Sequence, residues 1–137
     1  MKEQIVGNLA ICWRVEGIVG VRQMASRADQ DDLEVAIMGV EGLAEFTKET
    51  EQKAFLVTMP SLYQRKEVLD IYQQSDFNEV GVALVVKSFA GKIGGNMFLK
   101  LANRPNVVGR IVPTKLFTNE EKAIVWLQEQ IKKAKNT

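Results

Sequence analysis

Two short segments in the middle of the sequence, residues 54–59 and 80–86, consist almost entirely of apolar residues. Runs of this length are typical of β-strands that are covered on both faces, as in parallel sheets. Pro60 ends the first run. Exposed at a sheet edge, such strands would template aggregation, so we expect both of them in the middle of a sheet.

The first part of the chain has the alternating pattern of a β-hairpin. Residues 9–15 place Leu9, Ile11, Trp13 and Val15 on one side, and β character resumes at residues 18–22. Gly17 provides the positive φ that the tight turn between them requires, and Gly20 predicts a bulge or a close backbone approach. Near the other end, residues 111–117 predict a last strand, which Pro113 marks as interrupted or at an edge.

Segments with the apolar spacing of amphipathic helices separate and follow these strands. The first helix follows acidic capping residues at 29–32. Its apolar spacing predicts an inward side made of Leu33, Ala36, Ile37, Val40, Leu43, Ala44 and Thr47. The second opens at a capping box, residues 61–64, and the third covers residues 88–101 with Phe89, Ile93, Met97 and Leu101 stacked together. The last begins at a second capping box, residues 118–121, and turns inward Ala123, Ile124, Leu127 and Ile131.

The resulting order is β-β-α-β-α-β-α-β-α. It predicts an α/β fold with a mixed sheet of about five strands, right-handed crossovers and helices on both faces. No repeat, linker or low-complexity segment interrupts the pattern. We therefore expect residues 1–137 to form a single domain.

The sequence contains no histidine. Histidine is the commonest general base and the commonest metal ligand, so His-dependent hydrolytic triads are excluded and a zinc site would need an unusual ligand set. Nothing singles out a carboxylate pair either. We therefore expect no enzyme, no catalytic residue, no metal and no cofactor.

Several features bear on where the protein works. Cys12 is the only cysteine, so no internal disulfide can form, which agrees with a reducing compartment, and we expect its thiol to be buried and inert. No apolar stretch approaches the ~18 residues of a membrane span, and the first residues lack a signal-peptide core. We expect a cytoplasmic protein without a membrane span.

Charge is unevenly placed along the chain, although the net charge is only +1. Residues 29–51 hold eight acids and Lys48 as the one base, whereas residues 80–119 hold six bases and no acid. Such segregation can give a molecule two surfaces of opposite potential and favour a homodimer. The alternative is two solvated helix faces that balance each other. The basic stretch lacks interleaved surface aromatics, so no nucleic-acid partner is expected.

Three segments together resemble the small bacterial STAS/SpoIIAA-like domain family, in a branch of unassigned function. They are residues 80–86, residues 95–99 and residues 116–127, the last with the pattern LFT-x-E-E-x-A-x-x-W-L. The resemblance covers nearly the whole chain and implies a SpoIIAA/STAS-like fold. It also implies a bacterial signalling domain that binds proteins under phosphorylation control, or a binder of small ligands.

The resemblance implies one phosphorylation site, at Ser61. In the anti-sigma-factor antagonists the modified serine starts the helix after the central strand, and Ser61 has that position here. The match departs from the family, because residues 59–62 read Met-Pro-Ser-Leu and the antagonists carry Asp-Ser-Ser/Thr-Gly. As a helix N-cap, Ser61 also has a sufficient structural role worth about 1 kcal/mol.

A glycine-rich segment follows the second apolar strand: Gly91, Lys92, Gly94, Gly95 and Asn96. Backbone amides at a helix start could bind an anion there. Each glycine costs about 1 kcal/mol in a helix, so close packing is the favoured interpretation, either internally or at a subunit interface.

The sequence leaves two functions open. The first is a non-enzymatic regulatory or protein-interaction module whose partner proteins and process are unknown. The alternative is a domain that binds a small apolar or anionic ligand near the glycine-bearing helix. An open apolar pocket would favour the alternative, and a closely packed cleft would favour the first.

Overall fold

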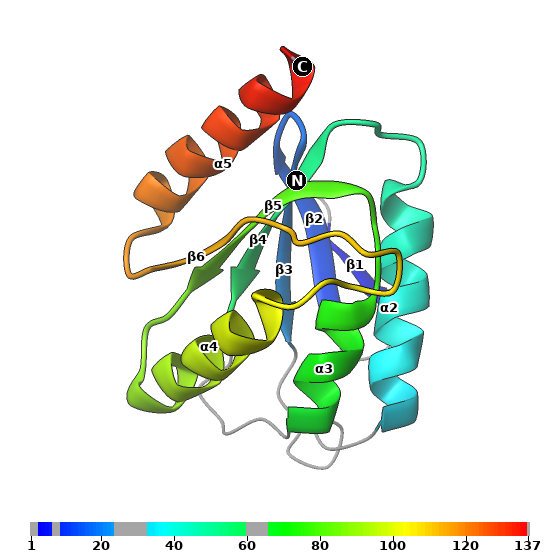
Figure 1. Ribbon diagram of the computed structural model, residues 1–137, viewed down its shortest axis with the longest axis vertical. Helices are drawn as coiled ribbons and strands as arrows, with labels where there is room; N and C mark the ends of the chain where they lie inside the picture. The colour runs from blue at the N-terminus through cyan, green and yellow to red at the C-terminus, as the bar shows by residue number, and fades with distance from the viewer. Residues whose placement is uncertain (1–2, 7–8, 24–32, 60–65, 137) are drawn as a thin grey trace.

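The computed structural model describes residues 3–6, 9–23, 33–59 and 66–136. It has an α/β fold with a mixed six-stranded sheet, in the order β1-β2-β3-β4-β5-β6 (Figure 1). The strands are β1 (Gln4–Val6), β2 (Leu9–Val15), β3 (Ile18–Gln23), β4 (Lys53–Thr58), β5 (Glu79–Val85) and β6 (Thr114–Phe117). The described helices are α2 (Leu33–Thr47), α3 (Lys66–Gln74), α4 (Phe89–Ala102) and α5 (Glu120–Lys135).

The strand pairing confirms the predicted mixed α/β sheet. β1, β2 and β3 are antiparallel, whereas β3, β4, β5 and β6 are parallel to one another. The two apolar runs form β4 and β5, and both lie inside the sheet, as expected. β6 lies at an edge after Pro113, also as expected. The prediction missed β1, an edge strand of three residues that is too short to show an alternating pattern.

Helices cover both faces of the sheet. We call α2, α3 and α4 the helix layer, which packs on one face around a core that includes Ile11, Phe55 and Leu84. Of the described helices, only α5 packs on the opposite face, where Ala123, Leu127 and Ile131 meet Ile18 and Leu56. The inward residues predicted for α5 are thus confirmed, with Ile124 half-buried.

Some of the sheet residues beneath α5 are small, although they lie beside Ile18 and Leu56. Ala54 and Ala83 are fully buried there, and a Cβ added to Gly81 would lie 3.2 Å from Cγ of Gln130. Gly17 turns the β2–β3 hairpin with φ of 81°. Because the small residues project little from the sheet, the buried side of α5 can approach it closely at these positions.

Several local predictions need correction. On α2, five of the residues predicted to face inward have different outcomes: Ala36 and Leu43 are buried, but Leu33, Ile37 and Ala44 are exposed. The reason is that the buried side of the helix runs through Gly39, which the apolar spacing did not include. On α4, Phe89 is 74% exposed, since it is the first residue of the helix and precedes the stripe that meets the sheet.

The start of α5 and the hairpin also differ in detail from the predictions. The N-cap of α5 is Asn119 and not Thr118, because the Asn119 side chain accepts a hydrogen bond from the amide of Lys122. The β-bulge lies between Trp13 and Val15, opposite the strand that carries Gly20. Because the bulge breaks the alternation there, Val15 is 38% exposed and does not join Leu9 and Ile11 in the core, although the pattern predicted it on their side. Gly20 instead leaves room for the Arg14 side chain, whose Cγ would lie 2.7 Å from an added Cβ.

Two capping predictions, at residues 29–32 and at Ser61 with its neighbours 62–64, fall outside the described residues. Within the described part of the chain, none of the helices is long and apolar enough to cross a membrane.

Candidate functional site

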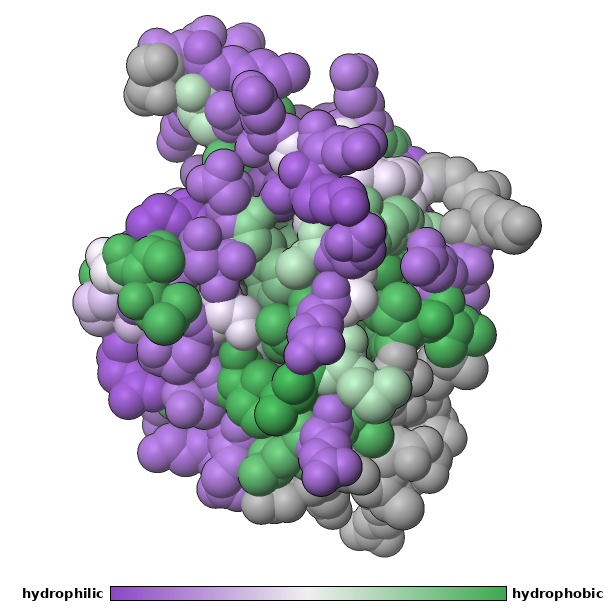
Figure 2. Space-filling view, turned by 90° about the vertical axis from the view of Figure 1, so that its right-hand side faces the viewer, coloured by the Kyte–Doolittle hydropathy of each residue, from purple (hydrophilic) through white to green (hydrophobic). Residues whose placement is uncertain are grey.

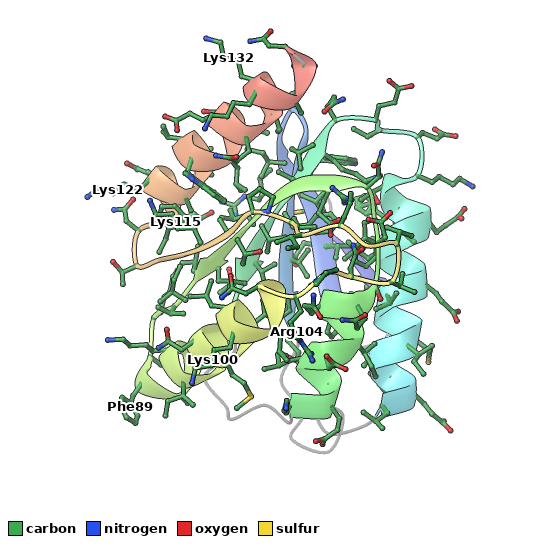
Figure 3. The ribbon with its side chains drawn as sticks, viewed as in Figure 1. Phe89, Lys100, Arg104, Lys115, Lys122 and Lys132 are labelled. Carbon is green, nitrogen blue, oxygen red and sulfur yellow. The ribbon has the colours of Figure 1, made fainter. Side chains whose placement is uncertain are left out.

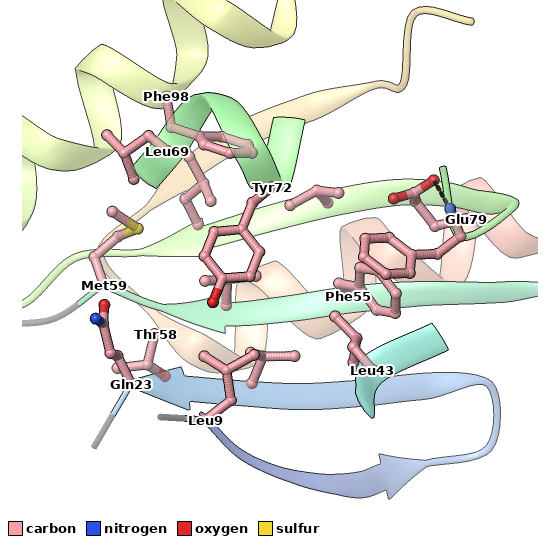
Figure 4. A pocket seen from close by; sticks show the side chains of 15 residues that line it. Leu9, Gln23, Leu43, Phe55, Thr58, Met59, Leu69, Tyr72, Glu79 and Phe98 are labelled. Carbon is pink, nitrogen blue, oxygen red and sulfur yellow. Dashed lines mark hydrogen bonds between the residues drawn. The ribbon is translucent and has the colours of Figure 1, made fainter. Parts of the chain in front are cut away.

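An apolar cavity of about 90 Å³ lies between the sheet and the helix layer. Every helix of the layer contributes to its wall, through Leu43 from α2, Leu69 from α3 and Phe98 from α4. Phe55 and Leu84 line it from the sheet (Figure 4). The volume exceeds that of a water molecule several-fold, and these apolar side chains offer water no hydrogen-bond partner.

Tyr72 of α3 projects its ring into this cavity, as Figure 4 shows. Its hydroxyl lies against α2, where a Cβ added to Gly39 would approach the Tyr72 oxygen to 2.7 Å and Cδ1 of Leu9 to 3.1 Å. Any larger residue at position 39 would therefore displace the tyrosine or the leucine. Gly39, costly inside a helix, is explained by the room that it leaves for the Tyr72 hydroxyl.

The Tyr72 hydroxyl forms no hydrogen bond with the residues that the structure describes. Burial raises the pKa of Tyr72 to about 12, so the phenol stays protonated and remains a donor at neutral pH. Tyr72 is partly buried, and its hydroxyl is not among the side-chain atoms that are both fully buried and unpaired in the described part of the chain. The hydroxyl is thus a positioned donor that can be reached by a partner entering the cavity.

One end of the cavity carries uncharged polar side chains. Gln23 and Thr58, with Met59, line that end, at the carboxyl ends of β3 and β4 (Figure 4). In open α/β sheets, ligands bind outside the carboxyl ends of the strands. The amide and hydroxyl groups there can receive the polar part of a molecule whose apolar part enters the cavity.

The opposite end of the cavity carries a buried carboxyl group. Glu79 is 4% exposed, and its Oε1 accepts a hydrogen bond of 2.8 Å from Nη2 of Arg110. Nη1 of Arg110 also donates to the carbonyl oxygen of Glu79, at 2.9 Å. Burial raises the pKa of Glu79, and the charge of Arg110 opposes that rise.

Arg110 belongs to a network that anchors the loop between α4 and β6. It donates from Nη2 and from Nε to Oδ1 of Asp76, at 2.9 and 3.1 Å. Asn106 donates to the same oxygen at 3.2 Å, while its own Oδ1 accepts from the amides of Val108 and Arg110. Burial alone would raise the pKa of Asp76, but Arg110 and Asn106 outweigh that effect and lower it.

A buried lysine completes the charged end of the site. Lys53 at the start of β4 pairs in register with Glu79, and its Nζ donates to the carbonyl oxygens of Thr47 and Thr50 at 3.0 and 3.2 Å. Burial lowers the pKa of Lys53, and the nearby carboxylates Glu79 and Asp76 oppose that shift. Lys53 therefore ties the end of α2 to the sheet and closes this end of the layer.

The glycine-rich segment forms the buried side of α4. Gly91, Gly94 and Gly95 are buried, and a Cβ added to Gly95 would lie 2.6 Å from Cδ1 of Leu116 in β6. Lys92 and Asn96 are exposed on the other side of the helix. The structure thus does not bring Lys92 together with the glycines at one site. The helix begins at Phe89, where its N-cap Ser88 accepts a hydrogen bond from the amide of Gly91.

The remaining sequence candidates lie away from the cavity or outside the structure. Ser61 falls outside the described residues. Cys12 was predicted to be buried, but it is only half-buried. It lies on the side of the sheet that α5 covers only in part. No cluster of three or more potential metal-ligating side chains occurs within residues 3–6, 9–23, 33–59 and 66–136.

Sequence reasoning missed the residues that define the site, namely Tyr72, Gly39, Glu79 and Arg110. Two signals could have indicated them. Gly39 interrupts an otherwise good helix, which indicates a close neighbour. Lys53 and Glu79 each directly precede an apolar strand, where burial of the strand would also bury the charge.

The fold and the cavity together define an α/β domain with an apolar cavity under three helices. Residues 12–131 match the model of a protein family described as a domain of unknown function, DUF7793. The match covers most of the chain, which therefore belongs to the DUF7793 family. No curated protein and no solved structure matches the chain. The family description names no process, so the resemblance to STAS/SpoIIAA-like proteins stays a prediction.

Proposed function

We propose that this domain is a binding module for a small, mainly apolar molecule that carries a hydrogen-bond acceptor. The observation that carries the proposal is the Tyr72 hydroxyl, a donor with no partner among the described residues that faces an apolar cavity. A carbonyl or carboxylate oxygen of the ligand would accept from this hydroxyl. The apolar walls would exclude water from the bond and so strengthen it.

The size of the cavity limits the ligand. About 90 Å³ is less than the ~150 Å³ of an engineered cavity that binds benzene, so the buried part of the ligand is a short aliphatic group or a small ring. Binding would stabilise the contacts of α2, α3 and α4 with the sheet, because all three helices line the cavity.

A matched pair of probes tests the proposal. Acetone and 2-methylpropene have nearly the same shape and differ only in a carbonyl oxygen against a methylene group, and both are smaller than benzene. Titration of each into ¹⁵N-labelled protein reports binding through the amide signals of cavity-lining residues. We expect the affinity for acetone relative to 2-methylpropene, which is the preference for the ketone, to be about tenfold higher in the unmutated protein than in Tyr72→Phe, since one hydrogen bond contributes about 1.4 kcal/mol. Binding of 2-methylpropene should be unchanged by Tyr72→Phe.

Two further variants provide controls. Leu69→Phe should fill the cavity and abolish binding of both probes, whereas Val125→Ser on the exposed side of α5 should change neither affinity. The proposal is wrong if neither probe shifts cavity signals in the unmutated protein. It is also wrong if Tyr72→Phe retains the full preference for the ketone.

A second candidate function, a protein-interaction module, is favoured by a rigid apolar turn. Val107, Val108 and Ile111 are 72%, 62% and 58% exposed. The Asn106 and Arg110 hydrogen bonds fix this turn, and the amide of Val107 donates to the carbonyl of Gln74 in α3. A rigid turn loses little conformational entropy on binding, which favours association with another protein.

Binding to a partner protein would depend on the two valines. We expect Val107→Ser combined with Val108→Ser to abolish recovery of a specific partner in affinity purification from the native host. Val125→Ser, which removes a similar exposed side chain from α5, should leave the recovery unchanged.

A further inference from the structure

The two outer helices of the layer carry opposite charge on their exposed sides. α2 presents Glu34, Glu41 and Glu45, whereas α4 presents Lys92 and Lys100 and no acid. Glu45 already pairs at 2.7 Å with Lys48, just beyond the end of α2, so the exposed side of α2 keeps a net negative charge from Glu34 and Glu41. Lys92 and Lys100 form no ion pair with any residue in the described part of the chain. α3 lies between the two helices and contacts both.

Each of these helices also exposes apolar side chains beside its charges. Ile37 and Met38 of α2 are 47% and 56% exposed, and Phe89 of α4 is 74% exposed. Figure 2 shows the α2 side of the molecule, where a column of hydrophilic side chains runs between hydrophobic patches. Figure 3 shows Phe89 and Lys100 projecting outward from α4. Exposed apolar patches rimmed by polar residues mark surfaces that bind other proteins, and aromatic residues and methionine are enriched in such surfaces.

We propose that the outer surface of the helix layer binds a second copy of this chain, related by a two-fold axis that runs along α3. This axis places α2 of each copy against α4 of the other, so that acids meet lysines on both sides of the axis. An axis across the helices would instead place α2 on α2 and bring Glu41 and Glu45 against their own copies. Charge complementarity therefore selects the first arrangement.

The surface is large enough for such a contact. The helices α2, α3 and α4 have 15, 9 and 14 residues and are therefore about 22, 14 and 21 Å long, which at about 9 Å per packed helix gives a flat footprint of about 500 Å². Side chains that project from the helices make the accessible area larger than this footprint. In an interface of standard size each partner buries about 800 Å² of accessible area. The inference does not depend on the ligand proposed above, because the charged residues are on the outside of the helices and the cavity is on the inside.

Charge reversal tests the interface by sedimentation velocity over a range of concentrations. Lys92→Glu with Lys100→Glu gives two acidic helices, and Glu41→Lys with Glu45→Lys gives two basic ones. We expect each double variant to raise the dimer dissociation constant at least tenfold. An equimolar mixture should form a heterodimer about as tight as the unmutated dimer, because α2 of one variant then meets α4 of opposite charge from the other.

The controls separate this surface from general charge effects and from misfolding. Lys132→Glu with Lys133→Glu makes the same change of charge on α5, outside the layer, and should leave the dimer intact. Circular dichroism should show that all variants retain the native fold, since every changed side chain is exposed. An unmutated chain that is monomeric at every concentration would overturn the proposal. The proposal would also be overturned if neither double variant raised the dimer dissociation constant, or if the equimolar mixture of the two variants formed no heterodimer.

Discussion

The two faces of the sheet are packed in different ways. Under α5 the sheet presents the small residues Ala54 and Ala83 among larger ones such as Ile18 and Leu56, and Leu127 is fully buried in this cluster. Under the helix layer the sheet presents larger side chains such as Phe55 and Leu84, and three helices must fit around them. The cavity lies on this second face, where the three helices meet.

The difference gives the sheet one face that is filled by a single helix and one face that contains a cavity. A single helix on a shallow surface can make contact along its whole length. Helices that come from three separate crossovers approach large side chains from different positions and leave space at their junction. We therefore expect the α5 face to contribute mainly to stability and the layer face to hold the ligand, at the cost of looser packing.

Leu127→Ala should have the largest effect on stability and tests the comparison directly. We expect a loss of about 3–5 kcal/mol of unfolding free energy, because a fully buried side chain leaves a new cavity. Leu69→Ala should cost only about 2–3 kcal/mol, since Leu69 already borders empty space and has fewer contacts to lose. Urea denaturation measures both. Equal losses would mean that the two faces are packed alike.

Gly95→Leu sharpens the comparison at the edge of the layer. The new side chain would collide with Leu116 and Val86, so we expect a loss of about 1–3 kcal/mol from overpacking. Asn96→Leu introduces the same side chain on the exposed side of α4 and should stay within about 0.5 kcal/mol of the unmutated protein. If thermal melts show Gly95→Leu to be as stable as Asn96→Leu, α4 does not pack closely on the sheet through Gly95.

Alkaline pH should weaken the layer face through Tyr72. The pKa of this phenol is about 12 in the folded protein and about 10 in an unfolded chain. Stability is fully present below pH 10 and falls as the pH rises from 10 to 12, because the unfolded chain loses its proton first. We expect the loss to be on the order of 1–2 kcal/mol, after allowing for the partial exposure of Tyr72.

The contribution of Tyr72 can be isolated by difference. We expect the unfolding free energy of the unmutated protein to fall between pH 8 and pH 12. The unfolding free energy of Tyr72→Phe should depend less on pH over the same range. In a Tyr63→Phe background, absorbance at ~295 nm follows Tyr72 alone, since the chain has two tyrosines. A titration midpoint of Tyr72 near pH 10, the value of an exposed tyrosine, would show that the phenol is in contact with water and would contradict this prediction.

The sequence predicted the elements that have a simple periodic pattern. The apolar runs gave β4 and β5, the alternation around Gly17 gave the hairpin, and the spacing of Ala123, Leu127 and Ile131 gave the inward side of α5. In each case the local pattern and the tertiary burial agree. The inward side of α2 was predicted less well, because Gly39 has no hydropathy signal and the exposed Ile37 has a misleading one.

The candidate site could not be predicted because it depends on contacts between distant segments. Tyr72 and Gly39 belong to different helices, and only the packing of α3 on α2 brings the hydroxyl to the glycine. Glu79 and Arg110 are likewise 31 residues apart. In both pairs, Tyr72 with Gly39 and Glu79 with Arg110, the sequence around one residue gives no sign of which distant residue it will contact.

Removal of the cap of α5 should have the smallest effect, although of the described helices only α5 supports its face of the sheet. Asn119→Ala removes one hydrogen bond, from the amide of Lys122 at 2.9 Å, and should cost about 0.5–2 kcal/mol. Asn119→Ser should restore most of that loss, because serine caps nearly as well. Thr118→Ala should stay within about 0.5 kcal/mol of the unmutated protein, since Thr118 is exposed and lies outside the cap. The sequence box centred on Thr118 predicts the reverse order of the two alanine variants, so thermal melts of both decide which residue starts the helix.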